Sequence, residues 1–189
     1  MVLEKVIEKV RNHSLDLSPE YLRAAVALAK QKQSAELAYA LAEVMPEKRK
    51  QLEKIVLQAK DPMICAYFAT DIPDANVAAH KKIIFDSKNT ESICYYMARV
   101  VPNKQDIIKA QNIIIEKQDS KAAFDFYSSV DGADFKVLSQ VAINQKDLEA
   151  LEGFKYFDGN DNADKTRVNL EYGKQRKSML KLSKDELTK

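Results

Sequence analysis

Apolar residues occur along this chain in short stretches at helical spacing, and residues that break helices separate these stretches at nearly constant intervals. A series of Pro and Gly residues has intervals of 27, 27, 29, 30 and 27 residues, and a second series has intervals of 28, 28, 30 and 28. A constant period between about 20 and 50 residues is typical of stacked-repeat proteins. The first series is Pro19, Pro46, Pro73, Pro102, Gly132 and Gly159, and the second is Gln33, Asp61, Asn89, Asp119 and Asp147.

The two interleaved series divide each period into two predicted helices. The first helix runs from a member of the second series to the next Pro or Gly, and the second helix runs on to the next member of the second series. Asp61-Pro62 is typical of a helix start, because the Asp side chain caps free amides and Pro fits the first helical position. Asn89 and Asp119 are expected to cap in the same way. The pattern therefore predicts an all-α fold, an α-solenoid of about five antiparallel helical hairpins with a period near 28 residues.

Aligning the copies predicts the core. The first helices carry a large apolar or aromatic residue five positions before the Pro or Gly, and the first four copies carry a small residue one position later. The second helices carry an apolar pair near their C-terminal end, as expected for helices that are covered on two sides. The large residues are Leu41, Phe68, Met97, Tyr127 and Phe154, the small ones are Ala42, Ala69, Ala98 and Ser128, and the pairs are Ala27-Leu28, Ile55-Val56, Ile83-Ile84, Ile113-Ile114 and Val141-Ala142.

The same pattern predicts a single helical-repeat domain over residues 1–189. Residues 1–18 are expected to form an N-terminal capping helix and its linker, residues 19–159 the repeats, and residues 160–189 a C-terminal capping helix with a basic tail. Solenoids need polar outer faces on their terminal units, which fits the loss of the apolar pattern at both ends.

Composition narrows the function classes. Hydrophobic residues make up 46% and charged residues 31% of the chain, as in a folded protein, and no apolar run is long enough to cross a bilayer. We therefore expect a cytoplasmic protein with no membrane partner. The formal net charge of +2 does not favour nucleic acid as the partner.

Few residues are available for catalysis or metal binding. Two Cys and two His are too few for a Cys-rich zinc site, and the chain has no Gly-rich phosphate loop or His-Glu-x-x-His motif. Cys65 and Cys94 share a repeat position with Ala and larger apolar residues, which predicts buried hydrophobes. His80 aligns with Leu52 and Leu138, so we expect it in or beside the core. The sequence therefore predicts a non-enzymatic protein with no metal site and no cofactor.

A binding surface is expected where the copies of the first helix differ from one another. Aromatic residues concentrate in these helices, and the two positions that precede the large core position vary between copies. Aromatic and Arg side chains dominate interface energies, although core packing or simple exposure to solvent also explains such variation. The predicted partner-binding residues are Tyr39, Tyr67, Tyr95, Tyr96, Arg99 and Phe126.

Cationic residues form two sets that suit an anionic partner. A C-terminal set without intervening acids predicts anion contacts, with a solvated terminal helix as the alternative. A second set places one Lys near the end of most second helices, where the helix macrodipole favours a cation. The C-terminal set is Lys174, Arg176, Lys177 and Lys181, followed by Lys184, and the second set is Lys32, Lys60, Lys88 and Lys146.

One stretch of the chain resembles a known type of repeat. Residues 69–77 read Ala-Thr-Asp-Ile-Pro-Asp-Ala-Asn-Val, and Ile83-Ile84 and Ser87-Lys88-Asn89 follow. This is similar to short helical-hairpin repeats, HEAT-like or tetratricopeptide-like in style, of uncharacterised bacterial and phage proteins, which tend to read Phe-Ala-x-Asp-Ile-Pro-Gly-Ala-Asn. Asp74 stands where Gly is usual, and Gly132 restores the Gly in a later copy. The resemblance covers residues 34–147, implies a helical-repeat architecture and carries no catalytic residue.

The function that these features predict is protein–protein interaction. Stacked hairpins offer an extended surface, so we expect a non-enzymatic module that binds an unidentified protein partner along one face of the solenoid. One alternative is a nucleic-acid-associated protein that uses the basic C-terminal helix. The other, which rests on the resemblance alone, is a phage-type inhibitor of a host protein.

Overall fold

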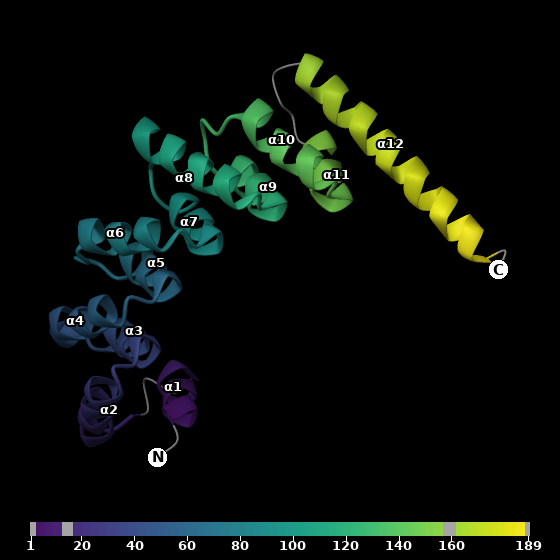
Figure 1. Cartoon of the computed structure of the whole chain (residues 1–189). Helices are drawn as coiled ribbons and strands as arrows, with labels where there is room; N and C mark the ends of the chain where they lie inside the picture. The colour runs from purple at the N-terminus through teal and green to yellow at the C-terminus, as the bar shows by residue number, and fades with distance from the viewer. Residues whose placement is uncertain (1–2, 13–16, 157–161, 188–189) are drawn as a thin grey trace. The chain divides into compact units, whose positions relative to one another are not determined.

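The computed structural model describes the backbone of residues 3–12, 17–156 and 162–187, with side chains in these ranges except at 162–165 and 180–187. Every regular element of this described part is a helix, so the fold is all-α as predicted (Figure 1). The α-helices are α1 (Leu3–Asn12), α2 (Pro19–Lys32), α3 (Ala35–Val44), α4 (Arg49–Ala59), α5 (Pro62–Asp71), α6 (Val77–Ser87), α7 (Thr90–Met97), α8 (Lys104–Lys117), α9 (Ser120–Ser129), α10 (Phe135–Gln145), α11 (Leu148–Tyr156) and α12 (Asn162–Leu187), and one turn of 3-10 helix, η2 (Pro46–Lys48), precedes α4.

The chain forms two compact units, residues 1–99 with α1 to α7 and residues 100–189 with α8 to α12, and the boundary falls within the range predicted for the repeats. Inside the first unit, the helices α2 to α5 each pack on the next two helices, α6 packs on α7, and α1 packs on α3. Inside the second unit, α8 to α12 pack in the same way. A helix that contacts two successive neighbours needs a broad apolar stripe, which explains the paired apolar positions of the second helices. None of the described helices has both the length and the apolar character needed to cross a membrane.

Five helix junctions share one local structure. Each preceding helix ends at a residue in the left-handed conformation, with φ between 50° and 55°, and the next residue caps the following helix. The side-chain oxygen of the cap accepts a hydrogen bond from the backbone N–H three residues later, at 2.8–3.2 Å. The left-handed residues are Gln33, Lys60, Lys88, Gln118 and Lys146, and the caps are Ser34, Asp61, Asn89, Asp119 and Asp147.

The predicted caps Asp61, Asn89 and Asp119 are confirmed, and the first member of their series is corrected. Ser34 caps α3, because its Oγ accepts from the N–H of Leu37, whereas Gln33 occupies the left-handed position before it. The Gln33 side chain bonds to the preceding helix instead, because its Nε2 donates to the carbonyl oxygen of Lys30 at the end of α2.

The corrected start of α3 also moves the first apolar pair of the second helices by one residue. Ala29 is fully buried and Leu28 is half-buried, whereas Ala27 is exposed. The pair is therefore Leu28-Ala29, and the predicted pair Ala27-Leu28 is wrong.

The first helices of the predicted hairpins are α3, α5, α7, α9 and α11. Their core position is the seventh residue after the cap. It is held by Leu41, Phe68, Tyr96, Phe126 and Phe154, each at most 4% exposed. Tyr96 and Phe126 thus replace Met97 and Tyr127 of the predicted series, although Met97 is also buried and Tyr127 half-buried. The prediction counted back from Pro and Gly, which lie two residues beyond the ends of α3 and α5 but five beyond the end of α7 and three beyond α9. Core packing does not set the length of these loops, so counting back from Pro or Gly gives a position one residue too late in α7 and α9. The predicted small residue Ala98 is exposed beyond the end of α7 for the same reason.

The second helices of the predicted hairpins are α2, α4, α6, α8 and α10. Each has a fully buried residue nine positions before the next cap. His80 takes this position in α6, in the core as predicted. The buried residues are Ala25, Leu52, His80, Ala110 and Leu138. Cys65 is also fully buried as predicted, and this desolvation raises the pKa of its thiol to about 12. Cys94 is half-buried, and neither Cys forms a disulfide.

The left-handed junctions predict a stabilising substitution. Lys60 adopts φ 55° at the end of α4, a conformation that costs a residue with a Cβ roughly 1–2 kcal/mol and costs Gly little. Lys60→Gly is expected to raise the free energy of unfolding by about 0.5–1 kcal/mol, measured by urea titration with circular dichroism. The matched control is Lys54→Gly, which lies inside α4 and should lower it by about 1 kcal/mol. Equal losses in both variants would contradict the prediction.

Candidate functional site

Three tyrosines from successive first helices form a continuous row of rings in the first unit. Tyr39 of α3 and Tyr67 of α5 have ring centroids 5.8 Å apart, and Tyr67 and Tyr95 of α7 meet edge to face at 4.7 Å. The Arg99 guanidinium carbon lies 3.5 Å from the centroid of the Tyr95 ring. We call Tyr39, Tyr67, Tyr95 and Arg99 the tyrosine row. Aromatic pairs at these separations stabilise each other. Tyr39 is buried, with 9% of its surface exposed, so the exposed part of the row is formed by Tyr67, Tyr95 and Arg99.

Carboxylates anchor one end of the row. The Tyr39 hydroxyl donates to Asp71 Oδ2 at 2.9 Å, and Glu43 Oε1 lies 3.4 Å from the same hydroxyl. Asp71 Oδ1 accepts from the Thr70 hydroxyl at 2.7 Å, so both oxygens of this carboxylate are engaged. Asp71 therefore connects the start of the row on α3 to the end of α5.

Burial raises the pKa of two phenols of the row. Desolvation raises the pKa of Tyr39 well above its ordinary value, and its hydrogen bond to Asp71 raises it further. Desolvation also raises the pKa of Tyr95, with a further contribution from the negative charge of Asp71 and an opposing one from Arg99. Neither hydroxyl carries a charge at physiological pH, so the charge of this region comes from its carboxylates and guanidinium groups.

A hollow of about 540 Å³ lies along the row. Arg11 of α1 stands at its edge and pairs with Glu36 of α3 at 3.0 Å. The hollow thus combines aromatic faces with charges of both signs. Its lining residues are Arg11, Tyr39, Glu43, Tyr67, Asp71 and Tyr95.

The structure brings together four of the six predicted partner-binding residues, the members of the tyrosine row. The other two are corrected: Tyr96 is 4% exposed and Phe126 is fully buried, because both hold the core position of their helices. Sequence reasoning missed the two carboxylates, Glu43 and Asp71. A signal for them existed, since each follows a tyrosine of the row by four residues and that spacing places two side chains on one helix face.

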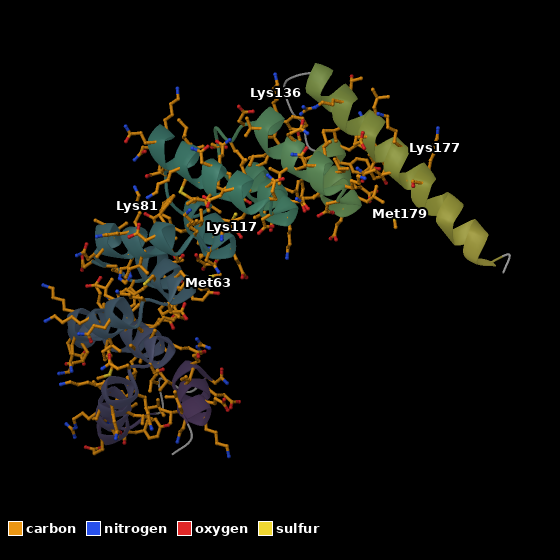
Figure 2. All side chains as sticks on the ribbon, viewed as in Figure 1. Met63, Lys81, Lys117, Lys136, Lys177 and Met179 are labelled. Atoms are coloured by element: carbon orange, nitrogen blue, oxygen red, sulfur yellow. The ribbon has the colours of Figure 1, made fainter. Side chains whose placement is uncertain are left out.

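The C-terminal cations lie on α12. Lys174, Arg176 and Lys177 are exposed, and Lys174 pairs with Glu171 at 3.6 Å (Figure 2 labels Lys177). The side chain of Lys181 lies outside the described residues. α12 packs on α10 and α11, and its buried residues Val168 and Tyr172 precede these cations in the chain.

The predicted row of lysines at the ends of the second helices needs one correction. Lys60, Lys88 and Lys146 share the left-handed junction position, but Lys32 lies one residue before it. The other residues at this position are Gln33 and Gln118, whose side-chain amides donate to carbonyl oxygens of their own helix at 2.9 and 2.7 Å. A long polar side chain near free carbonyls satisfies the helix end, so the position has a structural explanation.

His80 joins two second helices of the first unit. Its Nε2 lies 3.1 Å from Glu53 Oε1 of α4, and its ring stacks on Phe68 with centroids 5.1 Å apart. Glu53 Oε1 also accepts from the backbone N–H of Asn76, the cap of α6. Within the described residues, His80 Nδ1 has no hydrogen-bond partner. These contacts fit a neutral imidazole that donates through Nε2 to Glu53 and packs in the core.

Acid is expected to weaken the first unit through His80. Desolvation lowers the pKa of His80 in the fold, against an opposing effect of Glu53. The unfolded chain then binds a proton below about pH 6.5 that the folded chain resists, so this stability is present above that pH and is lost as the pH falls. Urea titrations at pH 7 and pH 5 should show a lower free energy of unfolding at pH 5.

The matched variant is His80→Leu, because Leu52 and Leu138 occupy the equivalent buried positions. The loss of stability between pH 7 and pH 5 should be smaller in this variant than in the wild type. The same loss in both proteins would show that other groups cause it.

No described group of three or more His, Cys, Asp or Glu side chains is placed to hold a metal ion. Comparisons of the chain with protein-family models, with curated proteins and with solved structures found no match.

Proposed function

We propose that the chain is an α-solenoid of about five helical hairpins that binds a partner protein along the face that carries the tyrosine row. Two observations support the architecture. The caps of the first helices are separated by 27, 28, 30 and 28 residues, and in each unit every helix after α1 packs on the next two, as far as the unit extends. Hairpins that cannot bury their apolar faces alone stack in this manner.

The tyrosine row is the single observation that carries the functional part of the proposal. Tyr67 and Tyr95 are half-buried, so each presents part of its ring to solvent while the rest is fixed by its neighbours. Rigid aromatic side chains lose little conformational freedom on binding, which makes Tyr a usual anchor of protein interfaces, and Arg is enriched at the same anchor positions. The carboxylates of Glu43 and Asp71 supply hydrogen-bond acceptors beside these anchors.

Site-specific crosslinking tests the proposal. A photoreactive benzoylphenylalanine at Tyr67 in the native host should crosslink one protein, whereas the same residue at Lys54, exposed on α4, should not crosslink it. The product at Tyr67 should disappear when the host also makes an excess of unlabelled wild-type chain. Identical products from both positions, or none from Tyr67, would count against a binding role for the row.

A further inference from the structure

A pair of equivalent grooves lies between neighbouring second helices. The first groove, about 590 Å³, lies between α4 and α6, and the second, about 340 Å³, lies between α8 and α10. Each groove belongs to a different unit, and each is described within its own unit. Neither groove contains a residue of the tyrosine row.

The same repeat positions line both grooves. Counted back from the cap that follows each helix, six lining positions are shared. The matched pairs are Leu57 and Ile115, Lys60 and Gln118, Ala79 and Val137, Lys82 and Gln140, Ile83 and Val141, and Asp86 and Asn144. Three of these pairs are aliphatic in both grooves and form the floor, while the other three are polar in both and form the rim. The fold thus repeats one surface, an aliphatic floor with a polar border.

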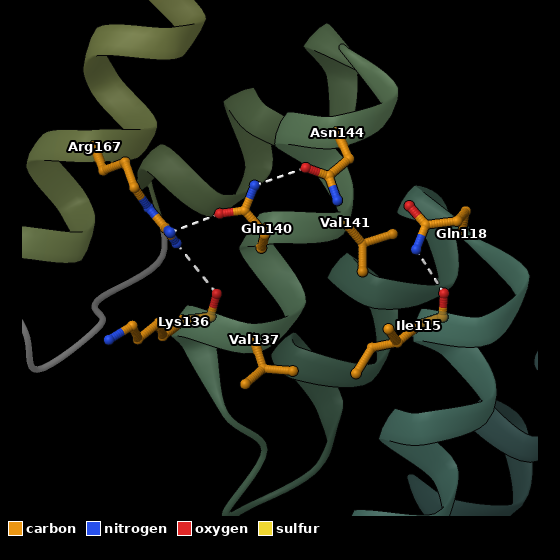
Figure 3. Close-up of a pocket in the computed structure, with 8 residues that line it drawn as sticks. All are labelled: Ile115, Gln118, Lys136, Val137, Gln140, Val141, Asn144 and Arg167. Atoms are coloured by element: carbon orange, nitrogen blue, oxygen red, sulfur yellow. Dashed lines mark hydrogen bonds between the residues drawn. The ribbon is translucent and has the colours of Figure 1, made fainter.

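The floor of the second groove is aliphatic and partly open. Ile115 of α8 and Val137 of α10 are half-buried, and Val141 of α10 lines the same groove (Figure 3). In the first groove, Leu57 and Ile83 are half-buried at the equivalent positions. Aliphatic surface that is gathered in a hollow gains free energy, about 25 cal/mol per Å², when an apolar side chain covers it.

A hydrogen-bonded chain fixes the rim of the second groove. The Arg167 guanidinium donates to Gln140 Oε1 at 2.7 Å and to the carbonyl oxygen of Lys136 at 3.2 Å, and Gln140 Nε2 donates to Asn144 Oδ1 at 2.7 Å (Figure 3). At the other border, Gln118 Nε2 donates to the carbonyl oxygen of Ile115 at 2.7 Å. The guanidinium group of Arg167, on α12, is therefore held in place at the edge of the aliphatic floor.

The charge of both borders is positive. The second groove has Lys136 and Arg167, and none of its eight described lining residues carries a carboxylate. The first groove has Lys60 and Lys82 against one acid, Asp86. An aliphatic floor with a cationic border is complementary to an aliphatic side chain that has carboxylates beside it. A nucleic-acid backbone matches the charge but offers no aliphatic group for the floor.

We propose that the two grooves are docking sites for an acidic and aliphatic peptide segment of a partner protein, which places a Leu or Ile side chain on the floor and a Glu or Asp beside Lys136 and Arg167 or beside Lys82. This inference does not depend on the tyrosine row.

A peptide titration of the full chain tests the proposal. The probe is acetyl-Glu-Glu-Leu-Ile-Glu-amide, and the readout is the methyl resonances of the chain labelled with ¹³C at Ile, Leu and Val methyl groups. Saturable shifts are expected at Ile115, Val137 and Val141 and at Leu57 and Ile83. Two control peptides separate the contributions: one replaces every Glu by Lys, and the other replaces Leu and Ile by Ser. Neither control should shift these methyl groups at the same concentration.

Two pairs of variants assign the binding to the border charges. Lys136→Glu should weaken the second groove by about fivefold, since reversal of an exposed charge changes a contact by roughly 1 kcal/mol. Lys121→Glu, exposed on α9 of the same unit, should leave it unchanged. Lys82→Glu and Lys54→Glu form the equivalent pair in the first unit. Tyr67→Ala should leave both grooves unaffected, so failure of the tyrosine row and failure of the grooves are separate results.

Several outcomes would overturn the proposal. These are an absence of shifts at the floor methyl groups, equal shifts with the Lys-containing peptide, and equal weakening by Lys136→Glu and Lys121→Glu. A 20-nucleotide single-stranded DNA that shifts the same methyl groups when the acidic peptide does not would also overturn it, in favour of nucleic acid.

Discussion

Tyr96→Ala is expected to lower the free energy of unfolding by about 3–4 kcal/mol, because Tyr96 holds the core position of α7 with 4% of its surface exposed. The ring fills the same position as the aromatic rings of Phe68 and Phe126, and its removal leaves a cavity that neighbouring helices cannot close. Urea titration followed by circular dichroism measures the loss. For a unit of about 100 residues, this loss is a large fraction of the total stability.

Tyr95→Ala is the matched control, since it removes the same side chain from the adjacent residue. Tyr95 is half-buried and belongs to the tyrosine row, so its removal should cost about 1–2 kcal/mol of stability, less than the removal of Tyr96. A larger loss for Tyr95 than for Tyr96 would show that the register of α7 described above is wrong.

Tyr67→Ala is expected to have the largest effect on partner binding. Tyr67 lies in the middle of the row, in contact with Tyr39 on one side and Tyr95 on the other. Truncation of a central aromatic anchor costs about 2–4 kcal/mol of binding free energy, which is roughly 30-fold to 1,000-fold in Kd. Isothermal titration of the purified chain with the protein that crosslinks at Tyr67 measures the change.

Tyr156→Ala serves as the control for binding, because Tyr156 is 73% exposed at the end of α11 and lies in the other unit. Its Kd should stay within about twofold of the wild type. The spectrum and urea midpoint of Tyr67→Ala establish that the variant is folded. Unchanged affinity in a folded Tyr67→Ala variant would exclude the row as the principal contact.

Helix starts were predictable from the sequence because their signals are local. An Asp or Asn that caps the next turn acts over three residues, and Asp61, Asn89 and Asp119 all do so. The exception is Gln33, which the regular spacing favoured although Ser34 follows it. Ser is a strong cap and Gln is not, so the chemistry of the residue was a better guide than the interval.

The sequence was a poorer guide to which residue of each helix faces the core. Tyr95 and Tyr96 differ by one position along α7, which turns the side chain by about 100° around the helix axis and separates surface from core. The count from Pro102 passed through a loop whose length differs from the other copies. Counting from the caps avoids loops and recovers the buried series.

The sequence alone did not predict the contacts of the candidate site that join residues far apart in the chain. The hydrogen bond from Tyr39 to Asp71 joins residues 32 positions apart, and it depends on how α3 and α5 pack. The border of the second groove likewise depends on Arg167, 27 residues beyond Gln140. Repeat alignment predicts which residues are equivalent, but it does not give the side-chain directions that bring them into contact.

The buried thiol of Cys65 makes α5 a reporter of its own local opening. With a pKa of about 12 and no exposed surface, the folded thiol is inert toward maleimide at neutral pH, so reagent reacts only in molecules whose α5 has separated from its neighbours. In a Cys94→Ser background, the labelling rate at low reagent therefore gives the free energy of that opening without denaturant. Partner binding across the tyrosine row, which includes Tyr67 on the same helix, would slow the labelling in proportion to its occupancy.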